Sequence, residues 1–369
     1  MSASDGVAAM WTPLKRAGTQ IRLPLSRQLG LGLAVLAAAM LMLGGCQPET
    51  GRSSPPLPSQ SPAPTSDDEA WPQTFPNTHG PDIELAGPAL NIVTMQPNIA
   101  EMLCAIGATS HVAAVDRYTD YPPEMLRKPK IGDILTPDYE KIVSMQPDLI
   151  ITSRGTAAEV LQKLRDLGMQ VLGVDPQSLG DVFSCMKMLG RLTGNAQVAA
   201  DIVAQLQRRR QAAVAKAQAA VDKQGRPRTV FVLQLDPLFV AGKSSFIASL
   251  IEDAGGKQVI AATVAGADQP WPQVSQETVL AASPEVLIFP SAQVGEERAD
   301  SPERLLAQLR QQAAWAQLPA VSNGRVYVID DDLITIPGPR LLRALEQMVD
   351  LLHPPSSATE QTSPGNGAE

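Results

Sequence analysis

Residues 195–224 read NAQVAADIVAQLQRRRQAAVAKAQAAVDKQ, a segment without glycine or proline. Alanine, glutamine and arginine dominate it, and all three favour the α-helix. At about 1.5 Å per residue the helix would be about 45 Å long, more than one small domain requires. Its apolar positions, such as Val198, Ile202 and Leu206, do not keep a heptad. We therefore interpret the segment as a spine that joins two lobes and not as a coiled coil.

On both sides of the spine, short apolar runs alternate with segments of helical spacing. The apolar runs lie at 90–95, 112–115, 149–152 and 171–174 before the spine, and at 229–235, 286–289 and 325–329 after it. Runs of this length, bounded by glycine, proline or polar residues, are typical of buried strands. Alternation of strands and helices predicts an α/β fold with parallel sheets flanked by helices in each lobe.

An internal repeat indicates that the two lobes are related. DYEKIVSMQPDLII at 138–151 aligns without gaps with SQETVLAASPEVLI at 275–288, an offset of 137. Each copy predicts an N-cap at Asp138 or Ser275, a short helix, a proline followed by an acid, and a buried strand. Glu140 and Glu277 then lie in the first helical turn, where the helix dipole favours an anion. The repeat alone leaves open whether these glutamates serve only the helix or also a partner.

The first residues form an export signal. Four basic residues precede an uncharged run of 15 residues at 29–43, which is followed by Gly44, Gly45 and Cys46. A helix that spans a bilayer needs about 20 residues, so a secretory signal peptide over 1–45 is preferred to a permanent transmembrane anchor. Either Met1 or Met10 can be its start. Small residues before Cys46 resemble the bacterial lipobox, which implies that Cys46 is lipidated and anchors the mature chain at the extracytoplasmic face of a membrane.

Composition divides the rest of the chain. Residues 46–87 are rich in Pro, Ser and Thr and are predicted to be a tether, and 354–369 a disordered tail. The folded part then comprises an N-terminal lobe at 88–193, the spine at 194–224 and a C-terminal lobe at 225–353.

Charge and residue counts argue against several functions. With a formal net charge of -8 and 4% aromatic residues, the chain lacks the features of a nucleic-acid-binding protein. Its three histidines and three cysteines have no metal-ligand spacing, so we expect no metal site and no cofactor. Gly242-Lys243-Ser244 resembles the end of a phosphate-binding loop, but Pro237 stands where that motif needs glycine. We therefore expect a binding protein and not an enzyme.

Four segments carry a resemblance to a known family. They are LNIVTMQPNIAEMLCAIGA at 90–108, DRYTDYPPE at 116–124, PKIGDILTPDYEKIVSMQPDLII at 129–151 and PWPQVSQETVLAASPEVLIF at 270–289. Together with the spine, they resemble the periplasmic binding proteins of ABC importers, in the class that takes up cobalamin, haem and ferric siderophores. YTDYPPE and PWPQVS are most similar to the cobalamin-binding members, which favours a corrinoid ligand.

The resemblance implies a fold and partners. It implies two α/β lobes joined by a single long rigid helix, a chelate ligand bound between the lobes, and a monomer that delivers this ligand to a permease dimer with its ATPase subunits. One glutamate on each lobe docks to permease arginines in this family. These glutamates fall on Glu140 and Glu277, the pair that the repeat also relates.

The resemblance also implies ligand-binding residues at Tyr118, Phe239, Trp271 and Asp332. Large flat rings suit a corrin because they offer apolar area with few rotors to freeze. Tyr118 and Phe239 can equally belong to the core, whereas Trp271 lies between two prolines in a polar loop, where a core role is less expected. Further pocket tryptophans of the cobalamin-binding members align with Ile134 and Ser153, so this pocket is less aromatic.

Two other ligands and one other class of function remain open. Tyr118 is a candidate axial ligand of haem iron. Arg117, Arg154 and Arg340 are candidate partners of an anionic ferric siderophore. The alternative of another class is an exported enzyme or a structural lipoprotein that uses the same fold without transport.

Overall fold

The computed structural model describes residues 70–260, 269–294 and 301–354. The N-terminal lobe contains a four-stranded sheet in the order β4 (Val112–Ala114), β3 (Ile92–Thr94), β5 (Leu149–Thr152) and β6 (Val171–Gly173). All its neighbouring strands are parallel. The predicted α/β class and the four predicted strands of this lobe are confirmed.

Helices cover both faces of this sheet because its strand residues alternate between two cores. In β3, Ile92 belongs to the core that α2 and α5 share, and Val93 to a second core with residues of α3 and α4. The helices of this lobe are α2 (Pro97–Ala105), η1 (Thr109–His111), η2 (Pro123–Arg127), α3 (Tyr139–Ser144), α4 (Ala158–Asp166) and α5 (Leu179–Leu192).

The C-terminal lobe repeats this layered arrangement with a mixed sheet. Its strands follow the order β11 (Val326–Ile329), β10 (Val286–Pro290), β7 (Arg228–Leu235) and β8 (Leu238–Val240), and β9 (Lys257–Gln258) also pairs with β7. Strand β8 runs antiparallel to β7, and the other pairs are parallel. The helices are α7 (Phe246–Asp253), α8 (Gln276–Ala282), η4 (Ser291–Val294), α9 (Ser301–Gln311), α10 (Ala313–Ala316), α11 (Pro319–Ser322), α12 (Asp331–Ile334) and α13 (Leu341–Leu352).

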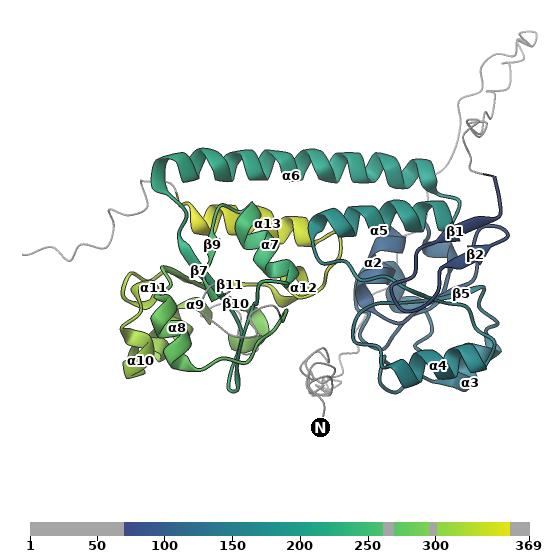
Figure 1. Cartoon of the computed structure of the whole chain (residues 1–369), viewed down its shortest axis with the longest axis horizontal. Coiled ribbons are helices and arrows are strands. Elements are labelled where there is room, and N and C mark those ends of the chain that lie inside the picture. Colours follow the sequence, from purple (N-terminus) through teal and green to yellow (C-terminus); the bar gives the residue numbers. More distant parts are fainter. Residues whose placement is uncertain (1–69, 261–268, 295–300, 355–369) are drawn as a thin grey trace, which may run out of the picture. The chain divides into compact units, whose positions relative to one another are not determined.

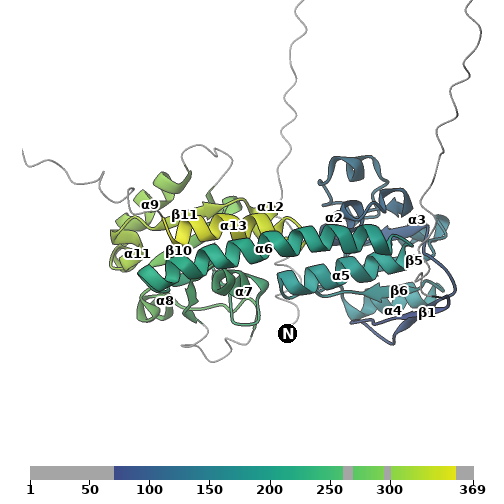
Figure 2. The same ribbon diagram turned by 90° about the horizontal axis from the view of Figure 1, so that it is seen from above.

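The predicted spine is α6 (Ala196–Gln224), which runs along α5 of one lobe and α13 of the other (Figures 1 and 2). It ends at Gly225, whose φ of 77° favours glycine. Ion pairs fasten it to the C-terminal lobe: Arg209 binds Glu346 at 2.8 Å and Arg210 binds Asp253 at 2.8 Å. Two neighbouring arginines of the spine therefore hold it against two different helices of this lobe.

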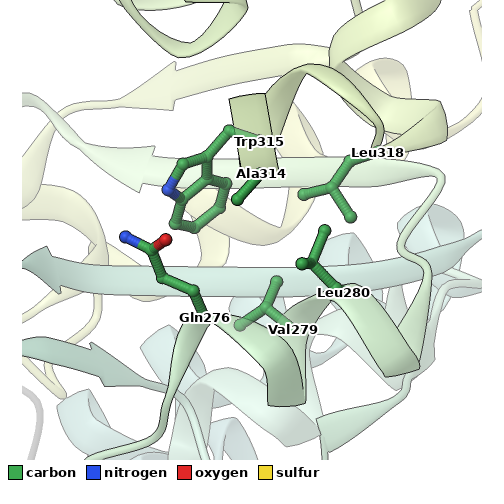
Figure 3. A pocket seen from close by; sticks show the side chains of 6 residues that line it. All are labelled: Gln276, Val279, Leu280, Ala314, Trp315 and Leu318. Atoms are coloured by element: carbon green, nitrogen blue, oxygen red, sulfur yellow. The ribbon is translucent and has the colours of Figure 1, made fainter. Parts of the chain in front are cut away.

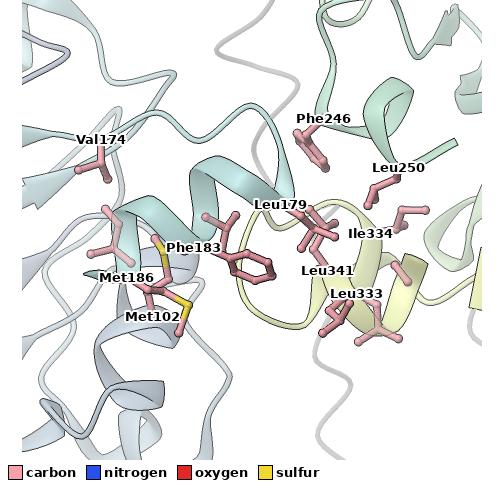
Figure 4. Close-up of a cluster of buried hydrophobic side chains, with 14 of the residues drawn as sticks. Met102, Val174, Leu179, Phe183, Met186, Phe246, Leu250, Leu333, Ile334 and Leu341 are labelled. Carbon is pink, nitrogen blue, oxygen red and sulfur yellow. The ribbon is translucent and has the colours of Figure 1, made fainter. Parts of the chain in front are cut away.

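The spine is accompanied by a second connection between the lobes. Leu179 and Phe183 of α5 lie in the same buried cluster as Ile334 of α12 and Leu341 of α13 (Figure 4). All four side chains are at most 2% exposed. The lobes therefore share one apolar core, in addition to the single helix that the sequence predicted.

The predicted extent of the tether is wrong at its C-terminal end. Residues 70–87 form two antiparallel strands, β1 (Gln73–Phe75) and β2 (Ile83–Leu85), and Phe75 is 0% exposed. The stretch is poor in apolar residues, but Phe75 and Leu85 bury themselves against the core of the N-terminal lobe. Residues 46–69, the signal peptide over 1–45 and the tail beyond 354 lie outside the described residues.

The backbone confirms the internal repeat. Among the described residues, the non-glycine residues with positive φ are Gln146 at 48° and Ser283 at 45°, which are also 137 positions apart. Each follows a repeat helix, α3 or α8, and precedes the proline and acid that lead into β5 or β10. Both copies therefore leave the helix through the same left-handed turn, a conformation that side chains other than glycine adopt rarely.

The same repeat ties each of these helices to its own sheet, α3 at the residue before β3 and α8 at the first residue of β7. Asp148 donates its N–H to Asn91 O at 2.8 Å and accepts from Asn91 N at 2.8 Å. At the equivalent positions, Glu285 N–H donates to Arg228 O at 2.7 Å, and Glu285 Oε2 accepts from Arg228 N at 2.8 Å. Asn91 and Arg228 also donate from their side chains to the carbonyls of the two left-handed residues. Helices α3 and α8 are therefore held rigidly within their own lobes.

Candidate functional site

Helices α3 and α8 present the predicted docking glutamates in matching positions. Asp138 caps α3 by accepting from Lys141 N at 3.0 Å, and Ser275 caps α8 by accepting from Thr278 N at 3.3 Å, as predicted. Glu140 and Glu277 are each the second residue of their helix, and both are exposed. A hydrogen bond from Ser275 and one from the residue's own backbone lower the pKa of Glu277, so it is ionised at neutral pH.

Apolar side chains lie beside both glutamates. One helical turn beyond them are Val143, which is 37% exposed, and Leu280, again 137 positions apart. On α8, Leu280 faces Trp315 and Leu318 across a small hollow (Figure 3). This hollow is lined by Gln276, Val279, Leu280, Ala314, Trp315 and Leu318. Each of the two helices therefore combines an exposed anion with an adjoining apolar surface.

A buried carboxyl group holds the loop of Tyr118. Asp116, which is 1% exposed, accepts from Tyr118 N at 2.9 Å and from the Thr119 hydroxyl. Burial raises the pKa of Asp116 to about 6 and outweighs these hydrogen bonds. Tyr118 is half-buried, with the Arg117 guanidinium carbon 6.0 Å from its ring centre. The Tyr118 backbone is thus fixed while part of its side chain stays accessible.

Phe239 and Trp271 lie together in the C-terminal lobe. Phe239 is half-buried on β8 and pairs with Gln273, two residues beyond Trp271. Trp271 is only 5% exposed, and its ring centre lies 6.4 Å from that of Phe231 and 5.9 Å from that of Phe246. The expectation that Trp271 is not a core residue is therefore wrong, because its loop folds it onto these two rings.

Asp332 lies on α12 and is half-buried. Its pKa is raised, first by burial and then by the charge of Asp120 and of the neighbouring Asp331 and Asp330. Asp120 belongs to the N-terminal lobe, two residues beyond Tyr118. The fold therefore brings the charges of Asp120 and Asp332 close enough from opposite lobes to repel each other, and the positive charge of Arg340 partly offsets this repulsion.

Each of the three candidate arginines is already paired with a carboxylate. Arg117 binds Asp133 at 3.2 Å, Arg154 binds Asp175 at 3.0 Å, and Arg340 binds Glu101 at 2.9 Å. These partners were not predicted. Arg340 and Glu101 are 239 positions apart, so the sequence gives no local signal of their contact.

Other features lie away from these residues. A second, open hollow lies on α6 and α13 and is lined by Arg209, Ala212, Ala213, Lys216, Glu346, Val349 and Asp350. Within the described ranges, no cluster of three or more His, Cys, Asp or Glu side chains is arranged to hold a metal ion. Nor does any helix in this part of the chain combine the length and apolarity needed to cross a membrane.

Comparison with known proteins places this architecture in context. Residues 92–333 match the family model described as periplasmic binding protein. The chain is 27% identical over 336 residues to the uncharacterized ABC transporter substrate-binding lipoprotein YvrC of Bacillus subtilis strain 168, covering 89% of this chain and 98% of the relative.

Two solved structures are similar to a comparable degree. The periplasmic vitamin B12-binding protein BtuF of Vibrio cholerae is 27% identical, with a TM-score of 0.60, covering 72% of this chain and 97% of that one. The periplasmic haem-binding protein RhuT of Roseiflexus sp. RS-1, in apo form, is 26% identical, with a TM-score of 0.60, covering 72% and 98%. Overall similarity therefore does not separate these two ligands.

Proposed function

The chain belongs to the periplasmic binding protein family, and on that premise we propose that it is the substrate-binding lipoprotein of an ABC importer that takes up a cobalamin-type corrinoid. The name of YvrC, which is similar along almost its whole length, supports the transport role. The protein binds and delivers its ligand and catalyses no reaction.

The observation that carries the choice of ligand is the pairing of Arg117, Arg154 and Arg340. Haem propionates and many ferric siderophores are anionic and would need cations as partners, since burial of an unpaired charge is costly. Here each guanidinium already binds a carboxylate of the chain, and Asp120 and Asp332 add negative charge between the lobes. The carboxamides at the edge of a corrinoid are uncharged, unlike propionates, and carboxylates accept hydrogen bonds from amides.

The half-buried rings of Tyr118 and Phe239 fit the same ligand. They come from different lobes and offer flat apolar area to a macrocycle. Haem is the nearest rival because the Tyr118 hydroxyl is a possible axial ligand of iron. The two ligands make different demands on this side chain, since a corrinoid would use the ring and haem would also use the oxygen.

Titration of the full chain with cyanocobalamin, haemin and ferric chelates, followed by absorbance, tests this choice. We expect saturable binding of cyanocobalamin and much weaker binding of the two iron ligands. Tyr118→Phe is the matched variant, because it keeps the ring and removes the hydroxyl. It should leave cyanocobalamin affinity within about tenfold, since one hydrogen bond contributes only about 0.5–1.5 kcal/mol. Tight haemin binding that is lost in Tyr118→Phe would overturn the corrinoid proposal in favour of haem.

We also propose that Cys46, which lies outside the described residues, carries the lipid anchor. Gly44 and Gly45 precede it at the end of a signal too short to span a bilayer. Cys46→Ser should release soluble protein or leave uncleaved precursor, as fractionation and immunoblotting would show. Mature protein that remains in the membrane fraction after this change would contradict lipidation at Cys46.

Glu140 and Glu277 complete the proposal as docking residues for the two permease subunits. A permease dimer offers two equivalent sites, and the repeat supplies two equivalent exposed anions. Their helices are tied to their own sheets by the same set of hydrogen bonds, which suits residues that must meet a partner in a fixed orientation.

A further inference from the structure

One ion pair joins the two lobes directly. Glu101 lies on α2 of the N-terminal lobe, and Arg340 immediately precedes α13 of the C-terminal lobe. The backbone N–H of Arg340 donates to Glu101 Oε1 and its Nε–H donates to Glu101 Oε2, both at 2.9 Å. The side chains of Arg340 and Glu101 are 13% and 4% exposed. Arg340 of the C-terminal lobe therefore binds both carboxylate oxygens of Glu101 in the N-terminal lobe.

Two neighbours complete this contact. The guanidinium carbon of Arg340 lies 4.0 Å from the ring centre of Tyr121, a residue of the N-terminal lobe. A Cβ at Gly338 would lie 3.1 Å from Glu101 Oε1, so glycine leaves room for the carboxylate. The carboxylate thus enters a recess formed by 338–340 of the opposite lobe. We name Glu101, Tyr121, Gly338 and Arg340 the interlobe latch.

The latch is a poor source of net stability. Burial, together with the charge of Asp332, raises the pKa of Glu101 in spite of the attraction of Arg340. The loss of hydration of two buried charges offsets much or all of their mutual attraction. The adjoining contact of Phe183 with the core of the other lobe already supplies apolar burial. What the ion pair adds is direction, because two hydrogen bonds to one carboxylate fix both distance and orientation.

We propose that the interlobe latch sets the spacing of the lobes, and with it the spacing of Glu140 and Glu277. Since α3 and α8 are each tied to their own sheet, the relation between the lobes is the remaining variable that determines this spacing. Glu101 and Arg340 are then positioning residues that act on permease docking through the lobes. This last step rests on the proposed function, whereas the control of lobe spacing does not.

Interlobe distances in the ligand-free full chain test the latch. Leu167 and Ser322 are exposed, lie in opposite lobes and are outside the proposed ligand and docking sites, so nitroxide labels fit there as cysteines. The three native cysteines are replaced by serine in every protein. Electron double-resonance spectroscopy should then give a narrow distance distribution when the latch is intact.

Two latch variants and one control separate the possible roles. Glu101→Gln removes the charge with little change of shape. Arg340→Lys keeps the charge and the backbone N–H donor but loses the Nε–H donor and the planar guanidinium. We expect both to broaden the distance distribution. Asp175→Asn is the control, since it breaks the Arg154 ion pair, which lies within one lobe, and it should leave the distribution narrow. Because Arg340→Lys is the milder change, it keeps the test decisive if Glu101→Gln fails to fold.

A purely structural role would give a different pattern. Both latch variants would then melt at lower temperature, while the folded molecules would keep the narrow distribution of the wild type. That result would overturn the latch proposal. It would leave the proposed function untouched, because the measurement needs neither ligand nor permease.

The docking step has its own readout, the stimulation of ATP hydrolysis by the reconstituted permease. If about one molecule in ten keeps the competent spacing, half-maximal stimulation should need roughly tenfold more binding protein, with an unchanged maximum. A broadened distribution with unchanged half-maximal stimulation would confine the latch to lobe spacing and remove its role in docking. The affinity of the binding protein for its ligand is measured separately by the absorbance titration.

Discussion

Replacing Glu140 and Glu277 together by alanine should stop most ligand uptake while leaving ligand affinity close to that of the wild type. Both side chains are exposed at the second position of their helices, away from the residues that meet between the lobes. Two charge-assisted hydrogen bonds across an interface are together worth roughly a hundredfold in affinity. Uptake by cells, permease-stimulated ATP hydrolysis and ligand titration on the same proteins measure the two effects separately.

Glu159 provides a matched control for helix stability. It is an exposed glutamate at the second position of α4, so it meets the same helix dipole, but it has no counterpart in the internal repeat. Glu159→Ala should cause a small loss of melting temperature and normal uptake. If the double variant of Glu140 and Glu277 also shows normal uptake with only a lowered melting temperature, the glutamates serve their helices and not the permease.

Local signals were sufficient to predict the framework of the fold. Strand β5 at Leu149–Thr152 is a short apolar run, and the spine α6 is a long segment rich in helix-favouring residues without glycine or proline. The type of each can therefore be recognised without knowing what surrounds it. The caps at Asp138 and Ser275 are also local, because a cap needs only a short polar side chain before the helix. The internal repeat, which is visible in the sequence alone, also indicated that the two lobes are related.

Features that depend on distant partners were not predicted. Phe75 and Leu85 lie in a stretch too poor in apolar residues to form a core alone. They are buried because they pack against the core of the N-terminal lobe. The ion pairs of Arg154 and Arg340 are of the same kind, since their carboxylates come from other elements. The sequence therefore indicated which arginines lie near the proposed site, but it could not show that each is already paired with a carboxylate.

Trp271 shows how this limit affects a ligand assignment, and Trp271→Ala should be strongly destabilising. The indole is 5% exposed and packs against the rings of Phe231 and Phe246. Loss of a buried tryptophan side chain costs about 3–5 kcal/mol, through lost burial and the cavity that remains. Chemical denaturation would measure this loss, and an unchanged midpoint would contradict the packing of Trp271 in the core.

Its role toward the ligand needs a variant that stays folded. Trp271→Phe keeps an aromatic ring in contact with the same neighbours, so its cost in stability should be much smaller. If the remaining exposed edge of Trp271 touches the corrinoid, this variant should weaken ligand binding at temperatures where it is fully folded. Trp315→Ala is the control, because Trp315 is 3% exposed in a separate core beside α8. It should destabilise the protein without altering ligand affinity, and equal affinity of Trp271→Phe and the wild type would assign Trp271 to the core alone.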